Sequence, residues 1–256
     1  MELQLWRNAT LQLDIQDLTI LIDPMLGKKG SFGAFPWTSD KRKNPIIDLP
    51  FGIDDLKKKL LSIDMVFVSH LHPDHLDETA IKLINKSTAV ICPKVISEPI
   101  SSYGFSNIIE LEDKLTLDKT VLHLTEGKHG EGKIQEKMGQ VNGLVIQYQD
   151  RNIYIAGDTI WCSEVKKNID IHKPDHIIFA GGAATFSIGE PVTMTATDIK
   201  ELASYSKNST IWITHLEAVS PCVEDREFLN VFLKENNLSK QCKILNDGEK
   251  VKLFTQ

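Results

Sequence analysis

The segment VSHLHPDHLDETA is the feature of this sequence that most restricts its fold, because it concentrates three histidines and two aspartates in one stretch. The apolar residues IDMVFV lead into it and are typical of a buried strand. His70 and His72 are two residues apart, so an extended backbone points both to one face. Pro73 then turns the chain before two further candidates, Asp74 and His75. The fold must therefore place several potential metal ligands together at the end of a buried strand.

Imidazole and carboxylate groups in this density indicate a site for zinc, manganese or iron. Four such groups within six residues do not easily share one tetrahedral ion, so we expect two ions with further ligands from elsewhere. His129 follows TVLHLTEGK, Asp158 ends NIYIAGD and His215 ends STIWITH. In each case an apolar strand runs into a ligand-type residue. Gly157 permits a close backbone approach beside Asp158, whose two carboxylate oxygens could bridge both ions.

Other candidates have simpler interpretations. His123 competes with His129, but the alternation in TVLHLTE gives it a sheet-facing role. His172 and His176 have no ligand-rich neighbours, and we interpret both as structural. We expect Cys162, close to Asp158 in sequence, to be a packed thiol rather than a nucleophile.

The order of predicted elements indicates an α/β protein with two mixed β-sheets packed face to face and helices outside. The first half begins with strands and a long ordered loop, followed by alternating helices and strands: strands 3–6, 10–15 and 18–23, loop 25–52, helix 53–61, strand 63–70, helix 77–86, strands 88–93 and 107–112. The second half repeats this order: antiparallel-type strands within 115–129 and 143–158, strand 175–182, helix 195–206, strand 209–215, helix 223–236, strands 242–247 and 250–254. No linker-like stretch separates the halves, so we predict a single domain over residues 1–256.

Charge and cysteine usage exclude several classes of protein. The formal net charge is −6, which disfavours nucleic acid as a partner. The N-terminal residues alternate polar and apolar types and do not resemble a signal peptide, and no apolar run approaches the ~18 residues of a membrane span. The four cysteines are scattered, which favours reduced thiols and a cytoplasmic location. We expect a small-molecule substrate and no membrane or nucleic-acid partner; assembly into a homo-oligomer stays open.

The ligand pattern resembles that of metallo-β-lactamase-fold hydrolases: His-x-His-x-Asp-His, then a later His, an Asp and a last His. Here these are HLHPDH, His129, the Asp158 of AGDT and the His215 of THLEA. The resemblance implies a four-layer αββα sandwich with the site at one edge between the sheets. It also implies that one metal binds to His70, His72 and His129, the other to Asp74, His75 and His215, and that Asp158 bridges them. The segments LIDPMLG, KNPIIDLP and TMTATDIKEL resemble the branch that contains L-ascorbate-6-phosphate lactonase and phospholipase D-like enzymes.

Two divalent cations, zinc or manganese with iron as an alternative, would activate a bridging hydroxide for hydrolysis. Asp74 and Asp158 are then the catalytic carboxylates, with Asp74 a ligand that also accepts a proton. The branch resemblance predicts a small anionic lactone or ester as substrate. A phosphodiesterase and an iron-dependent sulfur dioxygenase are the alternatives, whereas a flavodiiron enzyme is disfavoured because no flavin domain fits the length.

Specificity should come from loops over the metals. The candidates are Phe35, Trp37, Lys41, Arg42 and Lys43 in loop 25–52, Trp161, and Gly181, Gly182, Thr185 and Phe186. An aromatic wall with basic groups would suit a small organic anion, although the run DKRK also has the simpler interpretation of a solvated charged stretch.

Overall fold

The computed structural model describes residues 1–254, and its first seven-stranded sheet has the order β14-β1-β2-β3-β4-β5-β6. The strands are β14 (Lys250–Lys252), β1 (Glu2–Arg7), β2 (Thr10–Ile15), β3 (Leu18–Ile22), β4 (Met65–Phe67), β5 (Ala89–Pro93) and β6 (Ile108–Leu111). Neighbours from β14 to β3 are antiparallel, and those from β3 to β6 are parallel. The sheet is therefore mixed, as predicted.

The second seven-stranded sheet has the order β13-β12-β11-β10-β9-β8-β7. Its strands are β13 (Cys242–Ile244), β12 (Thr210–Thr214), β11 (His176–Ala180), β10 (Arg151–Gly157), β9 (Asn142–Tyr148), β8 (Thr120–Glu126) and β7 (Lys114–Leu117). Neighbours from β7 to β10 are antiparallel, and those from β10 to β13 are parallel. The two halves of the chain thus build sheets of the same design.

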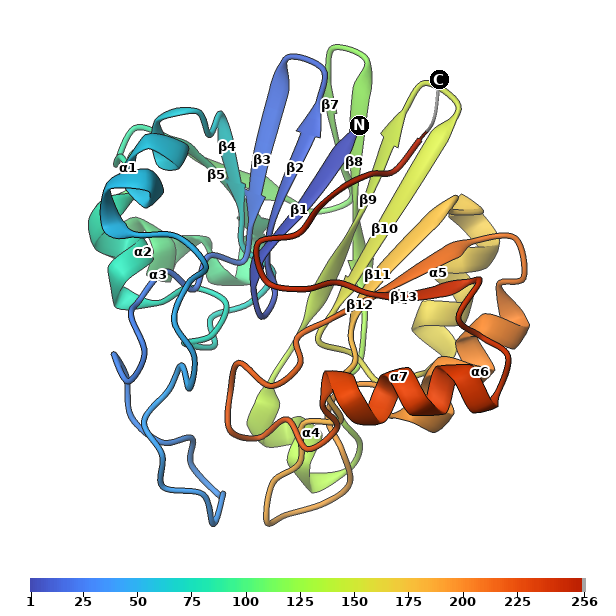
Figure 1. The fold of residues 1–256 in the computed structure, drawn as a ribbon. Coiled ribbons are helices and arrows are strands. Elements are labelled where there is room, and N and C mark those ends of the chain that lie inside the picture. The colour runs from blue at the N-terminus through green and yellow to red at the C-terminus, as the bar shows by residue number, and fades with distance from the viewer. Residues whose placement is uncertain (255–256) are drawn as a thin grey trace.

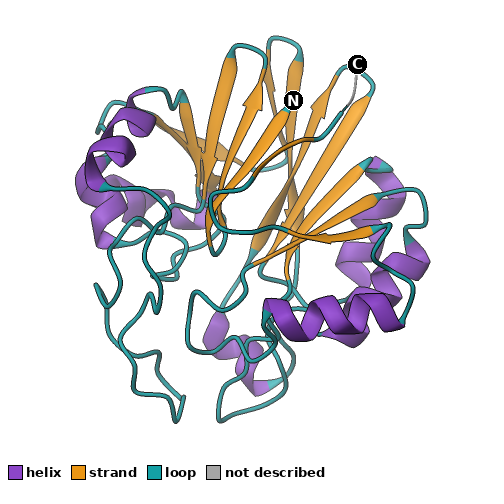
Figure 2. Ribbon diagram, viewed as in Figure 1, coloured by secondary structure: helices purple, strands orange, loops and turns teal. Residues whose placement is uncertain are grey.

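Helices cover the two outer faces, and loops gather at one end of the sheets (Figures 1 and 2). The first sheet is covered by α1 (Ile53–Leu61), α2 (Glu78–Leu83), the 3-10 turn η1 (Lys94–Ile96) and α3 (Ser97–Ser102). The second is covered by α5 (Ser163–His172), α6 (Ala196–Tyr205) and α7 (Arg226–Glu235), and α4 (Lys133–Met138) lies beyond the sheet ends. The four-layer αββα prediction is confirmed. None of the helices within residues 1–254 is long and apolar enough to cross a membrane.

Burial patterns explain why the sheets stack. In β2, Leu11, Leu13 and Ile15 are buried while Gln12 and Asp14 are half-buried, the period of two expected of a strand with one face on a core. These apolar side chains pack against the second sheet, including Leu144 and Ile153. Strands β5 and β11 are buried throughout, because a helical layer covers their outer face and the other sheet covers their inner face.

Helix boundaries were predicted with different accuracy: α1 spans residues 53–61 as predicted, although its N-cap Gly52 makes no side-chain capping hydrogen bond, whereas α2 is shorter than predicted. Asp77 caps α2 by accepting from the backbone N–H of Ala80 at 2.7 Å, and α2 ends at Leu83 rather than at the predicted residue 86. Helices α3, α4 and α5 were not predicted. The first two have only six residues each, and the N-cap of α5, Cys162, makes no side-chain capping hydrogen bond. Without length or a cap, the sequence carries little helical signal there.

Residues 25–52 form the long ordered loop that was predicted, with only an isolated bridge between Phe32 and Asn44. The loop is held by Arg7, whose guanidinium donates to the backbone carbonyls of Met25 (2.7 Å), Gly27 (2.9 Å) and Ile47 (3.1 Å). Arg7 is fully buried, so a charged side chain at the end of β1 fastens the loop to the first sheet.

Candidate metal centre

Sheet topology brings the candidate ligands to one edge. Strand β8 is antiparallel to β9, which is antiparallel to β10, and β10 to β12 are parallel. Hence β8, β10 and β12 all run the same way, and their carboxyl ends, followed by His129, Asp158 and His215, lie at the same end of the second sheet. The loop after β4 carries the other four candidates to that edge from the first sheet. The structure therefore brings all seven side chains together.

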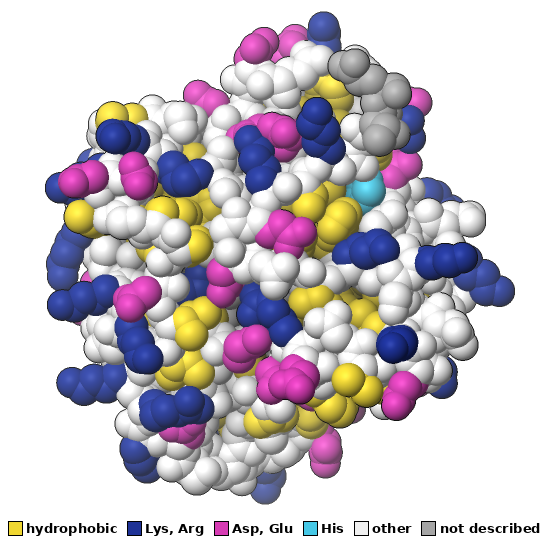
Figure 3. All heavy atoms as spheres, in the orientation of Figure 1, with side chains coloured by type: hydrophobic (Ala, Val, Ile, Leu, Met, Phe, Trp, Pro, Cys, Tyr) yellow, Lys and Arg dark blue, Asp and Glu magenta, His cyan; other side chains and the backbone are white. Residues whose placement is uncertain are grey.

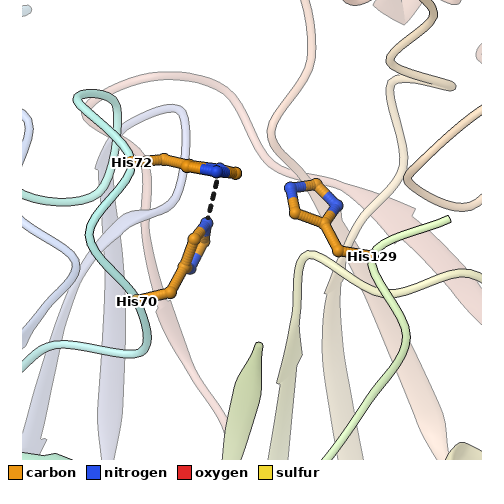
Figure 4. Close-up of side chains that lie close together, drawn as sticks. All are labelled: His70, His72 and His129. Carbon is orange, nitrogen blue, oxygen red and sulfur yellow. Dashed lines mark hydrogen bonds between the residues drawn. The ribbon is translucent and has the colours of Figure 1, made fainter. Parts of the chain in front are cut away.

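The first ligand set comprises His70, His72 and His129, whose nearest ligand atoms all lie within 4.8 Å of one another. His70 Nε2 is 2.9 Å from His72 Nδ1, and the His129 ring approaches them from the other side of the cleft (Figure 4). His70 and His129 are buried and His72 is half-buried. The spacing of two in the sequence thus produces the convergence expected of it.

The second ligand set comprises Asp74, His75, Asp158 and His215, all buried, with ligand atoms within 4.8 Å. His215 Nε2 is 3.0 Å from Asp74 Oδ2 and 3.3 Å from Asp158 Oδ2. His75 Nε2 is 3.2 Å from Asp158 Oδ2. Two carboxylates and two imidazoles therefore share a small buried volume.

Asp158 faces both sets with one oxygen. Its Oδ2 lies 3.7 Å from His129 Nε2 in the first set, as well as close to His75 and His215 in the second. The strand reaches this position through Gly157, whose φ of +69° is the left-handed conformation that favours glycine. This placement fits the bridging role suggested for Asp158.

In four of the histidines, Nδ1 contacts a further residue that is not itself one of the seven candidate ligands. His75 Nδ1 donates to Asp23 Oδ2 at 2.9 Å, and His129 Nδ1 donates to the Val192 carbonyl at 2.9 Å. Ser69 Oγ donates to Asp23 Oδ2 at 2.7 Å and so accepts from His70 Nδ1 at 2.9 Å. His215 Nδ1 lies 3.4 Å from Cys222 Sγ. Such partners select the tautomer and ring orientation of metal-ligating histidines.

The histidines of the first set are held neutral. Burial lowers the pKa of His129 to about 4, and burial together with the neighbouring imidazoles of His75 and His72 lowers the pKa of His70 well below its usual value. Burial also lowers the pKa of His72. Neutral imidazole is the form that binds a metal ion.

The histidines of the second set are shifted in the opposite direction, toward the protonated form. Burial disfavours the charged form of His75 and His215, but the nearby carboxylates, Asp158 first, raise the pKa of both well above the usual value. Burial likewise opposes ionisation of Asp74, yet the charge on His75 and the hydrogen bond from His215 lower its pKa to about 2. Charge in this set is therefore balanced between carboxylates and imidazolium groups when no metal is bound.

The donor atoms fit a pair of divalent cations. His75 Nε2 and Asp158 Oδ1 are buried and have no hydrogen-bond partner within residues 1–254, although His75 Nε2 lies close to Asp158 Oδ2 without hydrogen-bond geometry. A buried polar atom without a partner is costly unless something else satisfies it. Imidazole nitrogen and carboxylate oxygen are suitable ligands for zinc, manganese or iron. The residues present could hold a dinuclear site.

A cavity of about 260 Å³ opens over the two ligand sets. Its walls come from five segments that are distant in sequence, and they are mostly apolar. Besides the ligands His72, Asp74, His129, Asp158 and His215, they are lined by Phe35, Pro36, Trp37, Pro73, Lys137, Met138, Ala184, Phe186, Val192, Val219 and Pro221. The Lys137 ammonium lies 4.7 Å from the centre of the Trp37 ring. The cavity thus pairs a polar floor with aromatic and aliphatic walls.

The predicted specificity residues are only partly found in this cavity. Phe35, Trp37 and Phe186 line it, as predicted. Trp161 does not, because it packs against Tyr205 in a separate surface groove. Thr185 is not among the lining residues, and Gly181 and Gly182 pack behind the site, where a Cβ on Gly182 would lie 2.5 Å from the His215 carbonyl oxygen.

The basic run at residues 41–43 does not line the cavity either. Arg42 pairs with Asp40 at 2.6 Å and Lys41 donates to the Thr38 carbonyl, so the simpler interpretation of a solvated charged stretch describes it better.

Lys137 and Asp23 are among the residues of the site that the sequence analysis missed. Lys137 lies on the short helix α4, which has no cap or length signal, so nothing marked it. Asp23 had a signal, because it ends an apolar strand as Asp158 does, but it was interpreted only as a strand end before Pro24.

Comparison with known proteins agrees with this geometry. A family model described as "Beta-lactamase superfamily domain" matches residues 19–216. The "UPF0173 protein YddR" of Bacillus subtilis (strain 168) is 33% identical over 248 residues, covering 95% of this chain and 96% of the relative. A "UPF0173 metal-dependent hydrolase" of Lysinibacillus sphaericus (strain C3-41) is 23% identical over 260 residues, covering 99% and 100%.

Two solved structures are similar over nearly the whole chain. One is described as "a possible metal-dependent hydrolase from Veillonella parvula DSM 2008", with 29% identity, a TM-score of 0.92 and coverage of 98% of both chains. The other is the "isothiocyanate hydrolase from Delia radicum gut bacteria", with 30% identity, a TM-score of 0.92 and coverage of 98% of this chain and 99% of that chain.

Proposed function

The chain belongs to the metallo-β-lactamase superfamily of metal-dependent hydrolases, and from this premise we propose that it hydrolyses a small, largely apolar electrophile, with an isothiocyanate as the first candidate. The observation that carries this proposal is the cavity wall. Phe35, Trp37 and Phe186 provide aromatic surface directly above the ligand sets. Among the lining residues that the structure describes, Lys137 alone carries a fixed positive charge. Such walls favour an organic group that is mostly uncharged.

The similar structure described as an isothiocyanate hydrolase supports this choice of candidate. Hydrolysis of an isothiocyanate, R–N=C=S, consumes one water and yields the amine R–NH₂ and carbonyl sulfide. The water oxygen bonds to the central carbon, the carbon–nitrogen bond breaks, and both water protons end on nitrogen. The site must therefore bring water to an electrophilic carbon and carry protons to the leaving amine.

When bound, two cations would lower the pKa of a water and polarise the electrophile. We assign His70, His72 and His129 to one ion, Asp74, His75 and His215 to the other, and Asp158 to both. The donor types favour zinc or manganese, with iron as the alternative.

The chain's own groups would then do three things. The aromatic walls bind and orient the organic part, and they exclude water from it. Asp74 lines the cavity, where its carboxylate would accept a proton from the attacking water and pass it to nitrogen. Asp158 and the outer partners Asp23 and Ser69 keep the ligand geometry fixed.

A purified, metal-loaded enzyme should convert benzyl isothiocyanate to benzylamine and carbonyl sulfide in equal amounts. In H₂¹⁸O the label should appear in carbonyl sulfide during a single turnover with enzyme in excess. Chelator-treated protein and Asp158→Ala serve as controls. No amine above the uncatalysed rate with zinc, manganese or iron would overturn the isothiocyanate assignment.

The small anionic lactone or ester expected from the loop resemblance is the second candidate, and Lys137 at the cavity favours it. A charge-assisted contact of this kind is worth about 1.5–3 kcal/mol, or roughly a tenfold or larger effect on binding. Lys137→Met should therefore reduce kcat/KM at least about tenfold for an anionic lactone and leave a neutral isothiocyanate nearly unchanged. An unchanged value for every anionic substrate would remove this candidate.

Two further reaction classes are tested by the same preparation. A phosphodiesterase would release product from bis(p-nitrophenyl) phosphate, and a sulfur dioxygenase would consume molecular oxygen during turnover. Neither has a specific observation in its favour here.

We propose a small-molecule substrate without a nucleic-acid or membrane partner, and a cytoplasmic location. Figure 3 shows Lys and Arg side chains interspersed with Asp and Glu on the face in view, which suits no extended polyanion.

A further inference from the structure

We propose that Asn8 is a positioning residue for the second ligand set: its side-chain amide holds Asp74, and its backbone carbonyl holds His215. Asn8 lies in the tight turn between β1 and β2. Strand β1 runs in the same direction as β3, because each is antiparallel to β2. Its carboxyl end therefore reaches the same edge of the first sheet as the loop after β4, and Asn8 follows it directly.

The contacts tie together two ligands that belong to different sheets. Asn8 Nδ2 lies 3.3 Å from Asp74 Oδ2 and 3.4 Å from the Asp74 carbonyl oxygen. The Asn8 carbonyl accepts from the backbone N–H of His215 at 3.0 Å. Asp74 lies in the loop after β4 of the first sheet, and His215 directly follows β12 of the second. One turn residue thus sets the separation of two ligands that lie 141 residues apart and face each other at 3.0 Å.

The orientation of the amide is determined by Asp74. Asn8 is 1% exposed, and its Oδ1 is buried without a hydrogen-bond partner among the described residues. Reversing the amide would place this oxygen against the Asp74 carboxylate, where two acceptors repel each other. The N–H group must therefore face Asp74, and the amide loses one of its own hydrogen bonds to do so.

A turn role alone does not explain this arrangement. Asn8 has φ +58°, which Asn and Gly tolerate better than most residues. Asn237 has the same φ of +58° in a turn after α7, but it is exposed and contacts none of the ligands. Backbone conformation accounts for Asn at both places, whereas burial against a metal-ligating carboxylate occurs only at Asn8.

The consequence concerns metal binding. A donor on Asp74 Oδ2 stabilises the carboxylate and limits its rotation, and outer partners of this kind change metal affinity by about 10–100-fold. The inference rests on the metal centre of the proposed function, but it does not depend on which substrate is hydrolysed.

The test compares Asn8→Gly with the matched control Asn237→Gly, since both keep the left-handed conformation. Zinc is titrated against a competing chelator to obtain both dissociation constants, and the constant that His215→Ala abolishes is assigned to the second set. Asn8→Gly should weaken that constant by about 10–100-fold and leave the other within about twofold. If the zinc dissociation constants of Asn8→Gly equalled those of Asn237→Gly, the proposal would be overturned.

A second variant separates hydrogen-bond donation from shape and remains usable if Asn8→Gly does not fold. Asn8→Asp keeps the size and the tolerance of positive φ but offers an acceptor where a donor is needed. If donation matters, the second constant should worsen at least as much as in Asn8→Gly; an Asp variant that binds as tightly as the wild type would overturn the proposal. A wild type that binds no second ion would instead overturn the proposed function itself.

Discussion

At the scale of single residues, the position of one carboxylate oxygen, Asp158 Oδ2, affects both ligand sets. Asp158 Oδ2 approaches His129 of the first set and both histidines of the second, so one carboxylate oxygen contributes to both. A shift of this oxygen would change its distance to histidines of both sets.

Asp158→Asn should therefore impair both metal sites. The amide keeps the size of the side chain but removes the charge that two cations would share. Activity should fall by more than about 100-fold, since outer partners alone are worth 10–100-fold. Elemental analysis after dialysis should find clearly fewer than two ions per chain. His123→Gln, which changes a histidine outside both sets, is the control; an Asp158→Asn protein with the metal content of this control would contradict the bridging role.

The two sets should also take up metal with different pH dependence. The pKa of His129 is about 4, and those of His70 and His72 are lowered, so near neutral pH metal displaces no proton from them. The pKa values of His75 and His215 are raised, so metal must displace protons there, and affinity rises with pH up to those pKa values. Calorimetric titration in two buffers of different ionisation enthalpy should show proton release for the second set only. Equal release at both would contradict this.

At the scale of elements, the site depends on how a loop without regular structure is fastened. Loop 25–52 supplies Phe35 and Trp37 to the cavity wall. The fully buried Arg7 at the end of β1 holds three of its carbonyls. Burial lowers the pKa of Arg7 to about 10, so it is still cationic at neutral pH. The geometry of the cavity thus originates partly in the first strand.

Arg7→Lys should destabilise the protein although it keeps the charge. A single ammonium lacks the planar fork that reaches three carbonyls, and each buried group left unsatisfied costs about 1–3 kcal/mol. We expect a loss of about 2–4 kcal/mol in the free energy of unfolding from denaturant titration, with faster proteolysis within residues 25–52. Arg151→Lys, at a partly exposed ion pair with Asp175, should change stability by less than about 1 kcal/mol. Similar losses in both variants would show that Arg7 has no special anchoring role.

At the scale of the whole molecule, each ligand set contains residues from both sheets. His70 and His72 follow β4 of the first sheet, while His129 follows β8 of the second; the second set is divided in the same way. Metal ions would therefore connect the two halves of the sandwich at one edge.

Removing the metal should lower the melting temperature. An ion present at 100 times its dissociation constant adds about 2.7 kcal/mol, which corresponds to roughly 5–10 °C for a chain of this size. Calorimetric scans of chelator-treated protein with increasing zinc should show this rise. Calcium, which prefers sites built of oxygen ligands, is the control. A melting temperature independent of zinc would count against ions that join the sheets.

The sequence by itself determined most of the strands, four of the helices and the candidate ligands. Alternation in TLQLDI and the apolar runs before His70, Asp158 and His215 are local patterns, and local backbone geometry translates them directly into strands with a ligand at the end. The spacing of His70 and His72 likewise predicted that they converge. Short helices such as α4 escaped prediction because they have neither length nor a cap.

Only the tertiary structure decided which residues hydrogen-bond to the candidate ligands and which residues line the cavity above them. The hydrogen bond from His75 to Asp23 spans 52 residues, and that from Asn8 to Asp74 spans 66. The cavity places Lys137 over Trp37 and leaves the run at residues 41–43 outside, although the sequence favoured the latter as the basic group. Such contacts depend on which strands lie side by side and on where long loops are fastened. Local residue patterns do not encode them, because they arise from packing between segments distant in the chain.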